Sequence, residues 1–356
     1  MAKLRIKKHT FTNLLTYLSV IAAFVVMTLL KENGMLSRSL AGQLIPICCY
    51  MSMAVSLNLT VGILGELSLG HAGFMSVGAF SGVVAAMGLS GVIPSPTARL
   101  AIAMLVGTVC AAIAGAIVGT PVLRLKGDYL AIVTLAFGEI IKDLINCLLV
   151  GVDSDGLHIA FNITGNKTIA DLGLEEGGIA IIKGAQGATG TKTIATFTAG
   201  FILVMITLIV VLNLKHSRAG RAIMALRDNS IAAESIGLNV TKYKMMGFVT
   251  SAALAGAAGA LYALNFSSLQ ATKFNFNTSI LILVFVVLGG LGNLWGSLIA
   301  AAALTVLPEL LRAFSDYRML AYAIVLILVM LTTNNAAIKT FMSRFRIFKR
   351  GGKERG

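Results

Sequence analysis

The side chains of this sequence that could do chemistry are a few ionisable residues set inside long apolar runs. They are Glu66, His71, Asp128, Glu139, Lys142, Asp143 and Glu309. An ionisable residue is costly within a lipid bilayer, so each one there is a candidate for a functional role. They do not gather at catalytic or metal-ligand spacing. We therefore expect no catalytic residue, no metal site and no cofactor bound by this chain.

Three of these residues share one face of a helix predicted over 129–150. Glu139 precedes Lys142 by three positions and Asp143 by four, a spacing that makes them neighbours on a helix surface. The pattern favours a structural ion pair that faces inward, or a helix end near the membrane surface. A place for Glu139 on a translocation path is the alternative.

The elements that position these residues must be membrane-spanning helices. The chain has 356 residues, of which 57% are hydrophobic and 12% charged, and its mean hydropathy is +0.87. Soluble domains carry about 25% charged residues, so an ordinary soluble enzyme is excluded. Uncharged runs long enough to span a bilayer cover 9–30, 39–65, 67–98, 100–124, 193–214, 245–272, 274–308 and 319–338, and 129–150 is a further candidate. We predict an all-α polytopic integral membrane protein with about 8–10 transmembrane helices.

The net charge of +14 is concentrated in a few segments. Of the 29 Lys and Arg residues, 17 lie in the N-terminal segment 1–12, the loop 215–244 and the tail 339–356. Basic segments stay in the cytoplasm, so both termini and this loop are expected there, with the transmembrane domain over 13–338. The loop 151–192 carries five acids against three lysines and is expected outside. The charge thus indicates topology, not nucleic-acid binding.

Two glycine-rich breaks interrupt the apolar runs. One contains Gly65, Glu66, Ser68 and His71; the other contains Gly290, Gly292 and Asn293. Dense glycine interrupts a helix, and non-helical backbone at membrane depth survives only when it is buried in protein or lines a cavity. These seven residues are therefore translocation-path or gate candidates. The similarity of the two breaks indicates an internal repeat or a chance likeness.

The basic loop 215–244 is long enough to hold a short helix. Asp228, Asn229 or Ser230 can cap its start, and Gly237 can end it. The apolar residues that follow the cap favour docking into the groove of another protein, with an interfacial position on anionic lipid as the alternative.

Several motifs in order resemble one transporter family. They are Gly220-Arg221-Ala222, Ala225-Leu226-Arg227-Asp228-Asn229, Ala232-Ala233-Glu234-Ser235-Ile236-Gly237, Val286-Val287-Leu288-Gly289-Gly290-Leu291-Gly292, Gly65-Glu66-Leu67-Ser68-Leu69-Gly70-His71 and Leu125-Lys126-Gly127-Asp128-Tyr129. They resemble the permeases of branched-chain amino acid ABC importers, specifically the LivM-type subunit, across about residues 40–335.

The resemblance implies a type II-like ABC permease fold in the bacterial inner membrane that moves Leu, Ile and Val. It also implies four kinds of partner: a second, LivH-like permease subunit, two cytoplasmic LivG/LivF-like ATPases that bind ATP and Mg, a periplasmic branched-chain amino acid binding protein, and the lipid bilayer. The residues that it assigns to ATPase coupling are Arg221, Arg227, Asp228, Asn229, Ala233, Glu234 and Gly237.

Two other kinds of transporter fit the same residues. A urea or amide importer permease would resemble the same family, and a stand-alone secondary transporter or channel would work without ATPases. The chain itself has no Walker A motif: the nearest pattern, residues 187–193, lacks a Gly directly before Lys192 and lies in the predicted external loop. The loop at 152–157 and the segment 332–337 depart from the family pattern.

Overall fold

A computed structural model of the chain describes residues 8–35, 37–125, 127–153, 156–162, 169–173, 178–311, 320, 323–324 and 327. Residues 1–7 of the basic N-terminal segment, the segment 332–337 and the tail 339–356 lie outside the described residues. The chain forms two compact units, Met1–Ala302 and Ala303–Gly356. The first unit holds nearly all of the described structure, and the second begins within the last helix.

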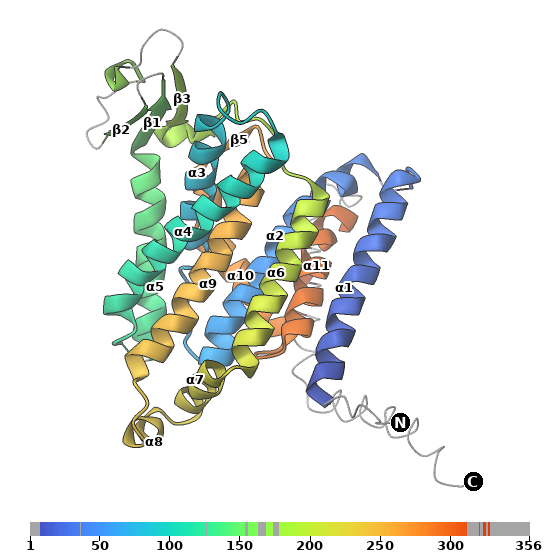
Figure 1. The fold of residues 1–356 in the computed structure, drawn as a ribbon, viewed down its shortest axis with the longest axis vertical. Helices are drawn as coiled ribbons and strands as arrows, with labels where there is room; N and C mark the ends of the chain where they lie inside the picture. Colours follow the sequence, from blue (N-terminus) through green and yellow to red (C-terminus); the bar gives the residue numbers. More distant parts are fainter. Residues whose placement is uncertain are drawn as a thin grey trace. The chain divides into compact units, whose positions relative to one another are not determined.

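Long helices packed side by side make up the first unit (Figure 1). They are α1 (Lys8–Glu32), α2 (Arg38–Asn58), α3 (His71–Gly88), α4 (Pro96–Val122), α5 (Asp128–Asn146), α6 (Phe197–His216), α9 (Val240–Ala263), α10 (Phe276–Gly289) and the start of α11 (Leu294–Leu310). Within the described part of the chain, five helical segments are long and apolar enough to cross a membrane: Arg38–Leu64, His71–Gly88, Pro96–Val122, Phe197–His216 and Val240–Ala263. The prediction of a polytopic helical membrane protein is confirmed, and the total of 8–10 spans stays a prediction.

Helices α3, α4 and α9 pack closely because small residues line their contacts. A side-chain carbon added at Gly256 of α9 would collide with Ala111 and with the carbonyl of Gly107, both on α4. One added at Gly259 would collide with the carbonyl of Met75 on α3. Backbones that approach this closely are typical of helix association in lipid.

The loop after α5, together with a short strand after α9, forms a small antiparallel sheet at one end of the helices (Figure 1). Its strands are β1 (Leu148–Val152), β2 (Leu157–Phe161), β3 (Ile179–Lys183), β4 (Ala188–Thr189) and β5 (Ser268–Leu269), in the order β2-β1-β3-β4-β5. Short 3-10 turns η2 (Ile169–Leu172), η3 (Gly184–Gln186) and η4 (Ala271–Phe274) flank them. This sheet was not predicted. The segment 187–193, which was the nearest pattern to a Walker A motif, contributes β4 to this sheet. The next helix, α6, begins only at Phe197, so the segment does not form a phosphate-binding turn at a helix start.

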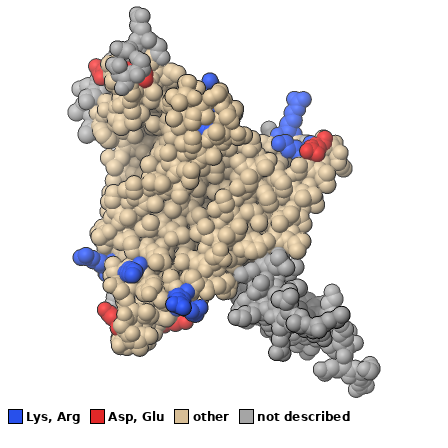
Figure 2. Space-filling model, in the orientation of Figure 1, with Lys and Arg blue, Asp and Glu red and all other residues tan. Residues whose placement is uncertain are grey.

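At the other end of the helices lie α7 (Arg218–Asp228) and α8 (Ser230–Ser235) (Figure 1). Asn229 caps α8 by accepting from the Ala232 backbone N–H at 3.0 Å, and Gly237, with φ of 86°, follows the helix end. Both features were predicted, whereas α7 was not. In Figure 2 the Lys, Arg, Asp and Glu side chains on the visible face gather at the two ends and leave an uncharged band between them, as a bilayer requires.

Candidate functional site

The first break (residues 59–70) begins as π-helical turns that end at a left-handed glycine. Segment η1 covers Leu59–Leu64, and Gly65 follows with φ of 82°. An added side chain at Gly65 would also collide with Arg227. Position 65 therefore requires glycine both for its backbone conformation and for the close approach of Arg227.

The second break (residues 290–293) separates two short helices. Helix α10 ends at Gly289, α11 begins at Leu294, and Gly290 and Gly292 have φ of 91° and 78°. Asn293 accepts from the Gly296 N–H at 3.3 Å through its side-chain oxygen, which satisfies one of the free donors at the start of α11. Asn293 is therefore a helix cap within the break.

The two breaks meet, and Asn58 joins them. The Asn58 side-chain oxygen accepts from the Gly292 N–H at 2.8 Å, and its amide donates to the Ser297 hydroxyl at 2.7 Å. Asn58 is fully buried, and a side chain at Gly62 would collide with it and with Gly292. Sequence reasoning missed Asn58; the available signal was that it is the only Asn in the uncharged run 39–65.

Two cations from the end of α6 and from α7 reach the breaks. The Arg227 guanidinium donates to the Gly62 carbonyl at 3.0 Å and to one carboxylate oxygen of Asp228 at 2.9 and 3.1 Å. Lys215 donates to the Gly292 carbonyl at 3.1 Å. Of these contacts, sequence reasoning named Arg227 but not Lys215.

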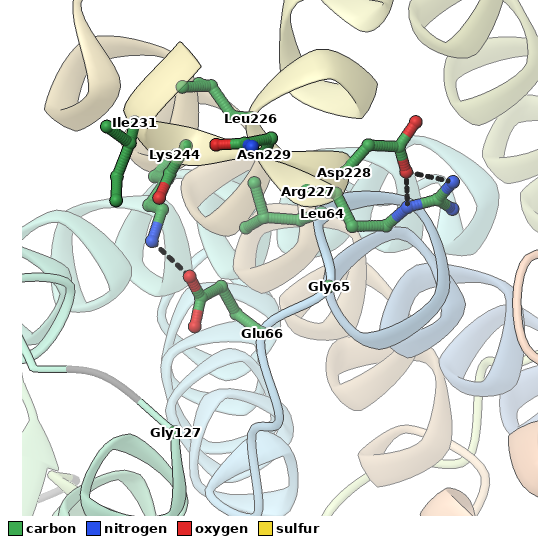
Figure 3. A pocket seen from close by; sticks show the side chains of 11 residues that line it. Leu64, Gly65, Glu66, Gly127, Leu226, Arg227, Asp228, Asn229, Ile231 and Lys244 are labelled. Carbon is green, nitrogen blue, oxygen red and sulfur yellow. Dashed lines mark hydrogen bonds and ion pairs between the residues drawn. The ribbon is translucent and has the colours of Figure 1, made fainter. Parts of the chain in front are cut away.

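A pocket of about 390 Å³ lies between the first break and the start of α8 (Figure 3). It is lined by Leu64, Gly65, Glu66, Gly127, Leu226, Arg227, Asp228, Asn229, Ser230, Ile231 and Lys244. Inside it, Lys244 of α9 forms an ion pair with Glu66, and both side chains are largely buried, at 11% and 13% exposed. Glu66 thus ties the first break to α9, and Lys244 is a partner that sequence reasoning did not single out.

Comparison with known proteins identifies the family of this chain. The profile of the family described as "Branched-chain amino acid transport system / permease component" matches residues 39–333. The chain belongs to this family. The permease is therefore a membrane subunit for transport.

Its relatives cover most of its length. The permease is 34% identical over 320 residues to the high-affinity branched-chain amino acid transport system permease protein LivM of Salmonella typhimurium, across 86% of this chain and 71% of the relative. For LivM of Escherichia coli the identity is 34% over 290 residues, 79% of this chain and 66% of the relative. The ribose import permease protein RbsC of Haemophilus influenzae is 29% identical across 81% of this chain and 82% of its own length. No solved structure matches the permease.

Two further gate candidates of the permease lie in the helix core. His71 is 2% exposed and its Nε2 shares a hydrogen bond of 2.8 Å with the Ser56 hydroxyl. The Ser251 hydroxyl donates to the Ser56 carbonyl at 2.6 Å, so the cluster joins α2, α3 and α9. Ser68 is also buried, and its hydroxyl has no hydrogen-bond partner among the described residues. The described residues contain no group of three or more His, Cys, Asp or Glu that could hold a metal ion.

Glu139 lies at the far end of α10 from the second break. One of its carboxylate oxygens accepts from the Phe276 N–H at 2.9 Å, at the first residue of α10, and the other pairs with Lys142. Lys142 also lies 3.5 Å from Asp143. The predicted shared face is confirmed, and Glu139 here positions the start of α10.

Of the remaining coupling candidates, Arg221 lies on α7, and Asn229, Ala233, Glu234 and Gly237 lie on or beside α8. Ala233 is buried, whereas Arg221, Asn229, Glu234 and Gly237 are exposed. The apolar surface that was predicted after the cap is present, with Ile231 78% and Ile236 76% exposed. Contact of these residues with an ATPase stays a prediction.

Proposed function

We propose that this permease carries branched-chain amino acids (Leu, Ile and Val) across the bacterial inner membrane as one subunit of an ABC importer. The observation that carries the proposal is the identity of 34% to LivM over 86% of the chain. The match to the permease family over residues 39–333 supports it independently of any single relative.

The energy source would be separate from this chain. Two cytoplasmic LivG/LivF-like ATPases would bind ATP and Mg, a LivH-like permease would complete the membrane part, and a periplasmic binding protein would deliver the substrate. The position of the LivM relatives within high-affinity transport systems supports this assembly. The permease itself would bind no cofactor.

The end of the molecule that carries α7 and α8 would face the cytoplasm, together with both termini. Its support is the concentration of Lys and Arg in 1–12, 215–244 and 339–356, since basic segments stay inside. The small sheet, which grows from the more acidic segment 151–192, would then face the periplasm, where the binding protein docks.

Coupling would pass through the segment 215–244. The exposed ridge of Ile231 and Ile236, with Asn229 and Glu234 beside it and with Arg221 on α7, would contact an ATPase. Closure of the ATPases would move this segment and shift the two breaks between outward and inward access. The breaks are suited to such a role because irregular backbone at membrane depth is typical of transport paths.

A sugar or another small solute is the competing substrate class. The 29% identity over 81% of the chain to a protein named as a ribose import permease supports this alternative. A urea or amide importer permease and a stand-alone secondary transporter also compete with the proposal.

Reconstitution tests the proposal. The complex of both permeases and both ATPases in liposomes, supplied with binding protein and internal ATP, is expected to accumulate labelled leucine. Unlabelled isoleucine and valine should compete, whereas ribose and urea should not. Competition by ribose or urea alone would reassign the substrate, and uptake driven by an ion gradient without ATP would contradict the ABC mechanism.

A further inference from the structure

Each break contains a backbone carbonyl that accepts a hydrogen bond from a cation. The Gly62 carbonyl accepts from Arg227 at 3.0 Å, and the Gly292 carbonyl accepts from Lys215 at 3.1 Å. Hydrogen bonds from a charged donor are stronger than those between neutral groups. The two irregular segments are therefore both held by charged side chains of the segment 215–244.

The two cations bracket one helix. Lys215 lies in the last turn of α6, and Arg227 lies in the last turn of α7. Only Ser217 separates the two helices, and its hydroxyl accepts from the Gly220 N–H at 3.0 Å to cap α7. Helix α7 is thus fixed at its start to the end of α6 and at its end to the first break.

The two breaks that contain these carbonyls are also bonded to each other. Buried Asn58 binds the Gly292 N–H at 2.8 Å, and Gly62 packs directly against both residues. A movement of α7 that pulls on Gly62 therefore acts on Gly292 as well. The bond from Lys215 holds the same turn through its carbonyl.

Helix α8 is connected to the breaks less directly. A pocket of about 390 Å³ is lined by Ser230 and Ile231 of α8 and by Gly65 and Glu66 of the first break; Figure 3 labels Ile231, Gly65 and Glu66 among its lining residues. By contrast, Arg227 packs so closely on Gly65 that no side chain fits there. Arg227 and Lys215 of the segment 215–244 thus contact the breaks directly, whereas α8 borders the pocket.

We propose that Arg227 and Lys215 are positioning residues that transmit movement of α7 to the two breaks as a two-point latch. The inference rests on the proposed function, since the movement is driven by the ATPases. Arg227 is held in place by its fork to Asp228, and it acts through the Gly62 carbonyl. Lys215 acts through the Gly292 carbonyl.

The test places a reporter in the second break of the assembled importer. Leu291, which is 58% exposed, becomes Cys in a background with Cys110→Ser and Cys147→Ser, and its maleimide labelling rate is compared without nucleotide and with ATP plus vanadate. The rate is expected to change with nucleotide in this background. In Arg227→Ala, Lys215→Ala and the double variant the difference should disappear, and leucine uptake per ATP hydrolysed should fall roughly tenfold or more, as for the loss of one charge-assisted hydrogen bond.

Two further variants separate transmission from general stability. Arg218→Ala removes an exposed cation from the first turn of the same helix and should leave both readouts unchanged. Arg227→Lys keeps a donor for Gly62 but not the fork to Asp228, so it should retain part of the nucleotide response. Complexes that assemble and keep the full response in the double variant would overturn the latch, as would a reporter that never responds to nucleotide. A reporter that responds while leucine is not transported would instead refute the amino acid assignment and leave the latch standing.

Discussion

Asn58 and Gly292, which are 234 residues apart in the chain, share a buried hydrogen bond of 2.8 Å between the Asn58 side-chain oxygen and the Gly292 N–H. This bond joins the end of α2 to the turn between α10 and α11. It brings together two irregular segments that would otherwise leave backbone groups unsatisfied inside a membrane protein, where water is not at hand to replace them.

Replacing Asn58 by Leu is expected to destabilise the permease. The Gly292 N–H would lose its partner, the Ser297 hydroxyl would keep only its bond to the Asn293 carbonyl, and an unsatisfied buried polar group costs about 1–3 kcal/mol. The measurement is the thermal unfolding midpoint of the complex in detergent. Ser52→Ala is the matched control on α2, because the buried Ser52 hydroxyl has no partner among the described residues; it should be neutral. Equal effects of the two substitutions would contradict the bridging role of Asn58.

Gly65→Ala is expected to cost both stability and transport. Alanine at φ of 82° is strained by about 1–2 kcal/mol, and its methyl group would displace Arg227. Gly34→Ala separates these effects, because Gly34 has φ of 68° but no atom near the added carbon. Unfolding midpoints should fall in both variants, whereas uptake should fall strongly only in Gly65→Ala. Uptake that falls equally in both would mean that backbone strain alone explains the loss.

The ion pair between Glu66 and Lys244 should tolerate the exchange of its two charges better than the reversal of one of them. Glu66→Lys places two cations together in a largely buried site, where an uncompensated charge costs several kcal/mol. The double variant Glu66→Lys with Lys244→Glu restores opposite charges and should recover much of the lost uptake. The recovery is measured from the leucine uptake and the unfolding midpoint of the two single variants and the double variant. A double variant as impaired as Glu66→Lys would show that the orientation of the pair matters beyond its attraction.

The sequence predicted the features that depend on local chemistry. Apolar runs predicted the spans, Asn229 and Gly237 predicted the ends of α8, and glycine density predicted the breaks that the structure shows at 65 and 290–293. It did not predict contacts that the fold creates across long separations: Asn58 with Gly292, Lys244 with Glu66 and Lys215 with Gly292 join residues 77 to 234 positions apart.

The small sheet was missed for a related reason. Its strands are two to five residues long, and β4 finds its outer neighbour in β5, about 80 residues later in the chain. Strands this short carry too little alternation to be read from sequence. Helix α7 was missed because its arginines and small residues are typical of a basic loop.

Glu139 offers the last test, because it sets the start of the helix that leads to the second break. Its carboxylate accepts from the Phe276 N–H at 2.9 Å and also pairs with Lys142. Glu139→Gln keeps one oxygen as an acceptor for Phe276 but loses the charge and the oxygen that pairs with Lys142, so we expect a cost below about 1 kcal/mol. Glu139→Ala removes the acceptor as well and should cost about 1–3 kcal/mol, with a parallel loss of uptake because α10 is no longer fixed at Phe276. Asp143→Asn, which alters a side chain that is 69% exposed, is the control for charge on the same face and should change little. The unfolding midpoints and the leucine uptake of the three variants distinguish a structural role of Glu139 from a role on the translocation path. If Glu139→Gln were as harmful as Glu139→Ala, the charge of Glu139 would matter more than its bond to α10.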